Sequence, residues 1–382
     1  MFKVFVALMA FLVFSGVLLN KFTRMPEPFP EGSLSAEYAK PGTGGIVTLS
    51  TALIDETRTT AANGEFPGAS ERTLKVTIWY PREIQSAPLL VYSHGLSSLS
   101  EGGKRVARHL ASHGYVVIAP NFPLSNFFAP GGPNALDVKN QPQDISFIID
   151  SALAWNRDPG HALYNMMDPE RIGVVGFSLG GLTSVLVAFH PAWRDERVKA
   201  AASIAAPLRM LGDRFFDHAN VPLLMLVGDR DAVVGHQINA AAVLPRTNNA
   251  QMVTIEGGTH TGFVSIARYL RWMKNPDSLG CSMVERSLEA HGDEAWVRVL
   301  GTEEQGILQS VSNDICNQNV APEAMNPLRQ QEITNTVLLS YFSSVFAETE
   351  EDRSLHQLFL AQTLSEELSD VRYSAQSPFT TN

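Results

Sequence analysis

The chain has 382 residues, of which 45% are hydrophobic and 18% charged, as in a globular protein with an ample core. Its formal net charge of −10, without a cluster of Lys and Arg, argues against nucleic acid as a partner. The length fits either one α/β core with insertions or two domains. The sequence contains no internal repeat and no long low-complexity tract.

The first 24 residues have the layout of an export signal or a membrane anchor. A run without charge extends from Val4 to Leu19, behind a short basic start. Spanning a bilayer takes about 20 apolar residues. Because this run is shorter and contains Ser15 and Gly16, we expect a cleaved signal and a secreted or periplasmic protein. Membrane anchoring through residues 4–19 is the alternative, since basic residues also follow the run.

Residues 25–45 are rich in proline and glycine, so we expect an extended lead-in there. After it, strand-like and helix-like segments alternate. The expected strands are 46–50, 74–80, 89–92, 115–119, 172–175, 200–205, 223–227 and 252–255, and the expected helices are 104–113, 145–155 and 182–189. Such alternation predicts a mostly parallel sheet with helices on both faces, and the first two strands suit an antiparallel pair at its edge.

The alternation stops between residue 272 and about residue 329, which predicts a helical insertion. This insertion contains the only two cysteines, Cys281 and Cys316. An exported chain with two cysteines suits an oxidising compartment, so we expect a disulfide, with two buried thiols as the alternative. A long amphipathic helix over 328–346 is expected to close the core, followed by a peripheral C-terminal tail over 348–382.

The segment Gly-Phe-Ser-Leu-Gly, residues 176–180, joins a buried strand to a helix. A turn this tight crowds its backbone, so the positions two residues before and after the serine must be small, as Gly176 and Gly180 are. The turn lifts the Ser178 hydroxyl above the sheet, at a helix N-terminus that favours developing negative charge. Ser178 is therefore the candidate nucleophile; the alternative, from these five residues alone, is a connection without chemistry.

Two later strand ends carry a carboxylate and an imidazole. Asp231 follows the strand 223–227, and His260 follows the strand 252–255. An imidazole that titrates near neutrality can take the serine proton, and a carboxylate behind it fixes its tautomer. The order serine, aspartate, histidine is that of one hydrolase fold. We prefer Asp231 to Asp229 because the later residue reaches toward the histidine loop.

A glycine step follows the strand 89–92. Gly95 can turn the backbone so that the N–H of Leu96 points into the space above the sheet. With the N–H of Leu179, it would form an oxyanion hole, in which one donor is worth ~3 kcal/mol of transition-state stabilisation. His94 precedes the serine and shares its loop with this donor, so we interpret it as a strand-end histidine bonded to backbone.

Together these residues resemble the α/β-hydrolase superfamily, and over roughly 45–347 its platelet-activating-factor acetylhydrolase and dienelactone-hydrolase-like branch. The motifs that carry the resemblance are Ile78-Trp79-Tyr80-Pro81, Tyr92-Ser93-His94-Gly95-Leu96, Ser112-His113-Gly114-Tyr115-Val116, Gly176-Phe177-Ser178-Leu179-Gly180-Gly181 and Gly258-Thr259-His260. The chain departs from the branch at Phe177, where relatives often carry histidine. A second departure is the candidate nucleophile Ser178, because true dienelactone hydrolases use cysteine in this role.

The resemblance implies an α/β-hydrolase domain over 46–347 and ester hydrolysis without a metal or organic cofactor. The roles it implies are Ser178 as nucleophile, His260 as base, Asp231 as acid, and Leu96 and Leu179 as oxyanion donors. We thus expect a serine carboxylic-ester hydrolase that forms an acyl-enzyme on a small-molecule or lipid-like ester. An acyltransferase, a thioesterase or a phospholipid-type acetylhydrolase with the same triad is the alternative.

Two segments are expected to form the walls of the pocket, because ligands lie beyond the carboxyl ends of strands in such sheets. They are the loop 120–142 and the insertion after His260. Phe122, Phe127 and Phe128 would supply apolar surface there. A covered apolar pocket favours small to medium uncharged esters, with acyl chains of about two to eight carbons.

Overall fold

The computed structural model describes residues 25–289, 297–311, 315–316 and 323–376. The export signal or anchor expected over 1–24 and the end of the expected tail, 377–382, lie outside the described residues. Within the described ranges, no helix is both long enough and apolar enough to cross a membrane.

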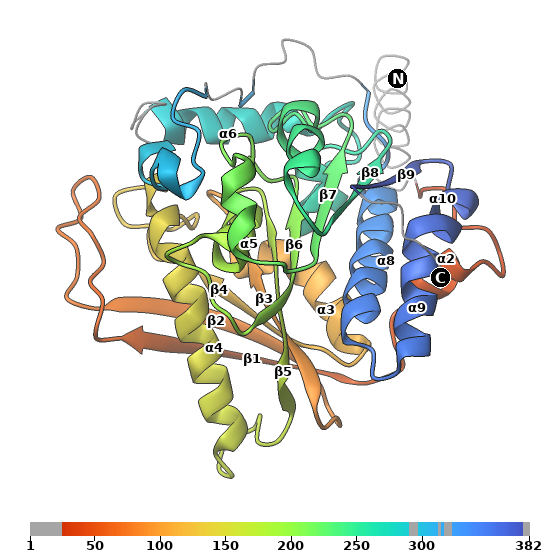
Figure 1. The fold of residues 1–382 in the computed structure, drawn as a ribbon, viewed down its shortest axis with the longest axis horizontal. Coiled ribbons are helices and arrows are strands. Elements are labelled where there is room, and N and C mark those ends of the chain that lie inside the picture. Colours follow the sequence, from red (N-terminus) through yellow and green to blue (C-terminus); the bar gives the residue numbers. More distant parts are fainter. Residues whose placement is uncertain (1–24, 290–296, 312–314, 317–322, 377–382) are drawn as a thin grey trace, which may run out of the picture.

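A mixed, mostly parallel sheet forms the centre of the molecule (Figure 1). Within the described residues it has nine strands in the order β1-β2-β4-β3-β5-β6-β7-β8-β9. β4, β3 and β5 to β8 are parallel, whereas β1, β2 and β9 are antiparallel to their neighbours. The strands are β1 (Ile46–Asp55), β2 (Arg72–Pro81), β3 (Ala87–Ser93), β4 (Val116–Asn121), β5 (Met167–Phe177), β6 (Val198–Ile204), β7 (Leu223–Gly228), β8 (Ala250–Ile255) and β9 (Val371–Ala375). The antiparallel pair expected at one edge is thus β1 and β2.

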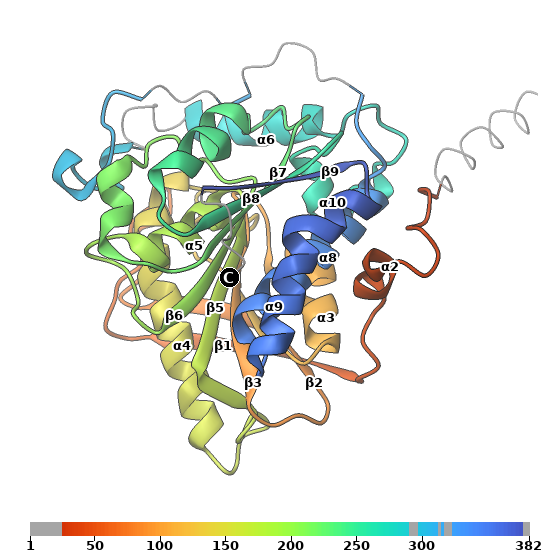
Figure 2. The ribbon, with the colours of Figure 1, turned by 45° about the vertical axis from the view of Figure 1, so that its right-hand side comes forward.

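Helices cover both faces of the sheet (Figures 1 and 2). They are α2 (Leu34–Ala39), α3 (Lys104–Ser112), α4 (Gln141–Arg157), α5 (Leu179–Phe189), α6 (Asp277–Glu289), α8 (Pro327–Phe346), α9 (Glu350–Leu358) and α10 (Leu364–Glu367). Leu89 and Val91 on β3 pack with the apolar residues of α4 and α5, while Leu90 and Tyr92 pack with those of α3 and α8. Because side chains alternate along a strand, a strand buried on both faces must be apolar throughout, as β3 is.

The lead-in is extended only in part, because it contains the short helix α2. Ser33 caps this helix, its hydroxyl accepting a bond from Ala36 N at 3.1 Å. The carboxylate of Glu367 then accepts bonds from Leu34 N and Ser35 N, at 3.1 and 2.8 Å. The lead-in is therefore fastened to the C-terminal helices, a contact over more than 300 residues that composition does not reveal.

The prediction of a peripheral tail is wrong for residues 350–375. β9 pairs with β8 from Gln251 opposite Ala375 to Ile255 opposite Val371, which completes the second edge of the sheet. Before it, Phe359, Leu360 and Leu364 are buried in the same core as α8. The physical reason is that an uncovered β8 would leave a row of unpaired backbone groups beside an apolar surface. Residues 350–375 therefore belong to the domain.

Candidate functional site

Ser178 lies on the turn between β5 and α5, with φ 55° and ψ −120°. Residues with a Cβ rarely adopt such a conformation, and it persists only where the surroundings enforce it. Here the amide of Ser178 donates to Ile204 O at 2.8 Å, which closes the turn against β6. A Cβ added at Gly176 would overlap the carbonyl of Gly180, and one at Gly180 would overlap that of Ser93. The two glycines therefore permit the turn, for the reason that the sequence pattern predicted.

Gly180→Ala is expected to lower activity and stability together, because the backbone of Ser93 must move away from the elbow. Overpacking of this kind costs about 1–3 kcal/mol. The matched control is Gly45→Ala, since a Cβ there would approach nothing nearer than the Arg82 side chain at 3.5 Å. Thermal unfolding and kcat/KM of both variants test this, and a Gly180→Ala protein equal to the control would show that the turn tolerates a side chain.

His260 joins Ser178 to Asp231. Its Nε2 lies 2.9 Å from Ser178 Oγ, and its Nδ1 lies 2.8 Å from Asp231 Oδ2. The other oxygen of Asp231 accepts bonds from Val233 N and Val234 N, at 2.9 and 2.6 Å. Because Asp231 and His260 are only 2% and 5% exposed, water hardly competes for these bonds. The structure thus brings together the three side chains that the sequence singled out.

Asp229, the other carboxylate considered at this strand end, binds elsewhere. Its Oδ1 accepts a bond from Gly257 N at 2.6 Å, and its Oδ2 lies 4.0 Å from Arg372 Nη2. Asp229 therefore stabilises the base of the loop, and the contact with His260 is left to Asp231.

The environment of His260 favours its protonated form. Burial lowers the pKa of the imidazole, but the charge and hydrogen bond of Asp231 and the charge of Asp277 raise it. The net direction is upward from the ordinary value of 6.5. An imidazole held in this way is a better acceptor for the Ser178 proton than a free histidine.

The loop after β3 lies directly against the elbow. A Cβ added at Gly95 would come within 2.9 Å of the Phe177 ring and 3.2 Å of Ser178 Cβ. Among the described residues, the next amide, that of Leu96, has no hydrogen-bond acceptor. Leu179 begins α5, so its N–H has no partner one turn earlier in the helix. The Leu179 amide thus follows Ser178 directly in the chain, and the Leu96 amide follows Gly95, which lies against Phe177 and Ser178.

His94 fixes that loop from behind, as expected of a backbone-bonded histidine. Phe122 N donates to His94 Nε2 at 3.0 Å, so Nε2 carries no proton and Nδ1–H donates to Gly95 O at 2.7 Å. Burial lowers the pKa of His94 to about 4, which keeps the ring neutral. The side chain ties the turn at Gly95 to the loop that follows β4.

The expected aromatic wall is only partly available to a ligand. Phe122 is fully buried and packs on the ring of His94, so it belongs to the core, contrary to its expected place in the pocket. Phe127 and Phe128 are 51% and 74% exposed, and their rings meet edge to face with centroids 5.1 Å apart. Phe127 N donates to Ser98 O at 3.0 Å, which keeps this pair close to the Leu96 loop.

The segment that follows His260 also exposes large apolar side chains. Ile266, Tyr269 and Trp272 are 63%, 62% and 48% exposed. Ser265 fastens the segment to the start of α3, its hydroxyl donating to Gly102 O at 2.9 Å. Exposed apolar side chains therefore occur on both segments that were expected to form the pocket walls.

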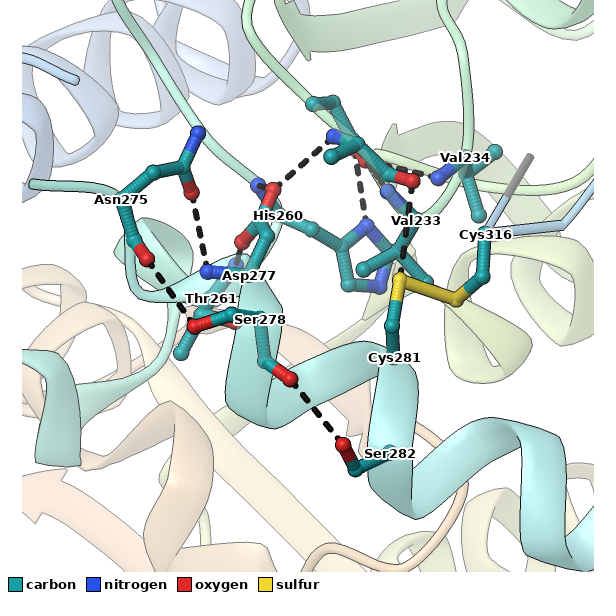
Figure 3. The surroundings of a disulfide bond; sticks show 12 residues. Val233, Val234, His260, Thr261, Asn275, Asp277, Ser278, Cys281, Ser282 and Cys316 are labelled. Atoms are coloured by element: carbon teal, nitrogen blue, oxygen red, sulfur yellow. Dashed lines mark hydrogen bonds and ion pairs between the residues drawn. A yellow bond between two sulfur atoms is a disulfide. The ribbon is translucent and has the colours of Figure 1, made fainter. Parts of the chain in front are cut away.

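The expected disulfide between Cys281 and Cys316 is confirmed, with Cα atoms 5.4 Å apart (Figure 3). It lies against the loop that carries Asp231. Cys316 N donates to Val233 O at 3.0 Å, and Cys281 Sγ lies 3.6 Å from Ala232 O. The insertion therefore packs on the acid loop.

Three polar side chains that hold the His260 loop were missed by sequence reasoning. The Gln330 side chain pairs with both backbone groups of Thr259, at 3.0 and 2.7 Å, and Gln331 Nε2 donates to Val264 O at 2.7 Å. Asp277 accepts a bond from His260 N at 2.9 Å. The signal for the glutamines was weak: two of them are adjacent near the start of an amphipathic helix that was expected to close the core.

Residues 61–275, more than half of the chain, match a family described as PETase: PET hydrolase-like. The chain belongs to the PET hydrolase-like family. The matched range contains Ser178, Asp231 and His260, and it ends before α6 and the disulfide.

Individual relatives of this PET hydrolase-like chain are distant. Platelet-activating factor acetylhydrolase of Bos taurus is 21% identical over 222 residues, which are 46% of this chain and 48% of that protein. Cutinase est2 and cutinase est1 of Thermobifida alba are each 24% identical over 212 residues, covering 52% of this chain and 64% and 65% of theirs. The chain therefore spans less than two thirds of the length of these relatives.

A solved structure with a similar fold is a ferulic acid esterase from Streptomyces cinnamoneus. The TM-score is 0.51 at 19% sequence identity, and the match covers 81% of this chain and 95% of the other. At this identity the likeness shows the fold alone. The α/β-hydrolase fold and the resemblance to the acetylhydrolase branch, both expected from the sequence, are confirmed.

Proposed function

We propose that the chain is a serine hydrolase of uncharged carboxylic esters, with Ser178, His260 and Asp231 as its catalytic residues. The observation that carries this proposal is the continuous path from Ser178 Oγ through His260 to Asp231, with contacts of 2.9 and 2.8 Å. Relatives named cutinase and acetylhydrolase, and a family described as PET hydrolase-like, support the same class of substrate.

In the proposed reaction, His260 Nε2 takes the proton of Ser178 as the serine oxygen attacks the ester carbonyl carbon. Asp231 stabilises the imidazolium through the Nδ1–H bond. The amides of Leu96 and Leu179 bind the oxyanion, and the positive end of α5 adds to their field. His260 then protonates the departing alcohol, and a water activated by the same nitrogen releases the acid from Ser178.

The first test is covalent labelling. A fluorophosphonate forms a stable adduct with the activated serine of a serine hydrolase, so mass spectrometry of the digested protein is expected to find the adduct on Ser178. Active protein that carries the adduct on another serine, or none at all, would contradict the proposal.

For specificity we propose small to medium uncharged esters, supported by the exposed apolar side chains Phe127 and Phe128 on the loop after β4 and Trp272 on the segment after His260. On p-nitrophenyl esters, kcat/KM is expected to peak at acyl chains of about two to eight carbons, each accommodated methylene contributing up to ~0.8 kcal/mol. A rate that rises through C16 with activation at an oil–water interface would instead indicate a lipase. A phospholipid with a short sn-2 chain, a thioester, and acceptors other than water test the three alternatives: an acetylhydrolase, a thioesterase and an acyltransferase.

We also propose that the protein is exported and works outside the cytoplasm. The disulfide between Cys281 and Cys316 supports this, because such bonds persist in oxidising compartments. Sequencing the N-terminus of the protein recovered from the medium or periplasm is expected to begin after the apolar run. An intact N-terminus in the membrane fraction would support anchoring through residues 4–19.

A further inference from the structure

Asp277, the first residue of α6, is completely buried and faces the His260 loop (Figure 3). Its Oδ2 accepts bonds from Ala232 N and His260 N, at 3.0 and 2.9 Å. Its Oδ1 accepts a bond from Thr261 N at 2.7 Å. Because Ala232 directly follows Asp231, one carboxylate joins the loop of the proposed acid to the loop of the proposed base.

These bonds differ from those of an ordinary acid at a helix start, which accepts bonds from the first amides of its own helix. The amides that Asp277 binds come from two loops, 16 to 45 residues earlier in the chain. No Lys or Arg among the described residues forms an ion pair with it, and no group of three or more His, Cys, Asp or Glu in that part of the chain could hold a metal ion. Its charge is therefore balanced by backbone N–H groups, and its field reaches the neighbouring imidazole.

The groups that face His260 are few. Asp231 comes from the loop after β7 and Asp277 from α6, while the turn before α5 presents two uncharged side chains, Ser178 and the ring of Phe177 at 4.7 Å. From α8 the loop meets the uncharged Gln330 and Gln331. Among the residues that the structure describes, Asp277 is thus a second carboxylate beside this histidine, after Asp231.

We propose that Asp277 is a positioning residue that holds the acid and base loops in register and places a second negative charge behind the His260–Asp231 pair. The inference rests on the proposed function. The disulfide at Cys281, one turn further along α6, anchors the helix from which Asp277 acts, since Cys316 is itself bonded to Val233. Asp277 lies two residues beyond the range that matches the family.

The test is Asp277→Asn, which keeps the size of the side chain but removes its charge and one acceptor oxygen. We expect kcat to fall about 10- to 100-fold with little change in KM, because His260 is less well placed. We also expect the acid limb of kcat/KM to move to lower pH. The sign follows because the lost negative charge had favoured the imidazolium, so its pKa falls.

The matched control is Asp195→Asn. The Asp195 side chain, which is 7% exposed, also accepts a backbone bond, from Arg197 N at 3.0 Å, but it is paired with the Arg197 guanidinium and precedes β6, at the end of the sheet opposite Ser178. It is expected to lose stability without a shift of the acid limb. Asp277→Glu, which retains the charge, is expected to lower kcat while leaving the acid limb in place. This variant tests the proposal if the asparagine variant does not fold.

An Asp277→Asn protein with the parental kcat and acid limb, or with losses equal to those of the control, would overturn the inference. So would an acid limb displaced equally in Asp277→Glu. Ser178→Ala, measured in parallel, separates the two proposals. Full activity in that variant means that the proposed function is wrong, whereas an inactive variant beside a normal Asp277→Asn protein refutes only the role of Asp277.

Discussion

Replacing Ser178 by alanine is expected to lower kcat/KM by about 10⁴- to 10⁶-fold while the protein stays folded. The reason is that, in the described site, the nucleophile that contacts His260 Nε2 is the hydroxyl of Ser178, and its loss leaves no group to form the acyl-enzyme there. His260→Ala and Asp231→Asn are expected to cause losses of similar order. The losses are not additive, because the three residues act as one unit, so Ser178→Ala/His260→Ala should be no slower than Ser178→Ala.

Asp229→Asn is the matched control for Asp231→Asn, since both carboxylates lie on the same loop. Asp229 bonds to Gly257 N and lies near Arg372, away from the imidazole, so its loss should affect stability more than turnover. Initial rates on a p-nitrophenyl ester, divided by the concentration of folded protein measured by circular dichroism, decide the matter. If Asp229→Asn is inactive and Asp231→Asn is active, the acid has been misassigned.

The sheet and the elbow could be predicted because their signals are local. An apolar run of four or five residues, such as Leu89–Tyr92, is readable without knowing its neighbours, since a strand buried on both faces must be apolar at every position. The glycines around Ser178 likewise meet a local steric requirement, because a Cβ at Gly176 would overlap the carbonyl of Gly180 and a Cβ at Gly180 would overlap that of Ser93. Asp231 and His260 could then be chosen because each follows a predicted strand, in the order serine, aspartate, histidine.

The missed features depend on contacts between segments far apart in the chain. β9 has only five residues, and its place in the sheet follows from the free edge of β8, which the sequence of the tail does not contain. Phe122 lies in a loop, where the sequence does not distinguish an exposed phenylalanine from a buried one, and its place in the core follows from its full burial against the ring of His94. Asp277 has the signature of any acid at the start of a helix.

The disulfide is expected to stabilise the domain and, through the acid loop, to support turnover. Linking residues 35 positions apart restricts the unfolded chain, which is worth roughly 3–4 kcal/mol in the chain-entropy model. The double variant Cys281→Ser/Cys316→Ser should therefore unfold at lower urea concentration, with a slope no smaller than that of the parent, because the unlinked chain exposes more surface when it unfolds. Its kcat should also fall more than its KM rises, because the bond from Cys316 N to Val233 O and the anchor of α6 beside Ala232 are both weakened.

Reduction of the parental protein provides the matched experiment. Dithiothreitol is expected to move its urea transition to that of the double variant, while the variant itself does not respond. Thiol counting in denaturant without reductant should find no free cysteine. Two free thiols there would rule out the bridge in solution, and a normal kcat in the double variant would show that Asp277 and the backbone bonds of the acid loop position Asp231 without help from the disulfide.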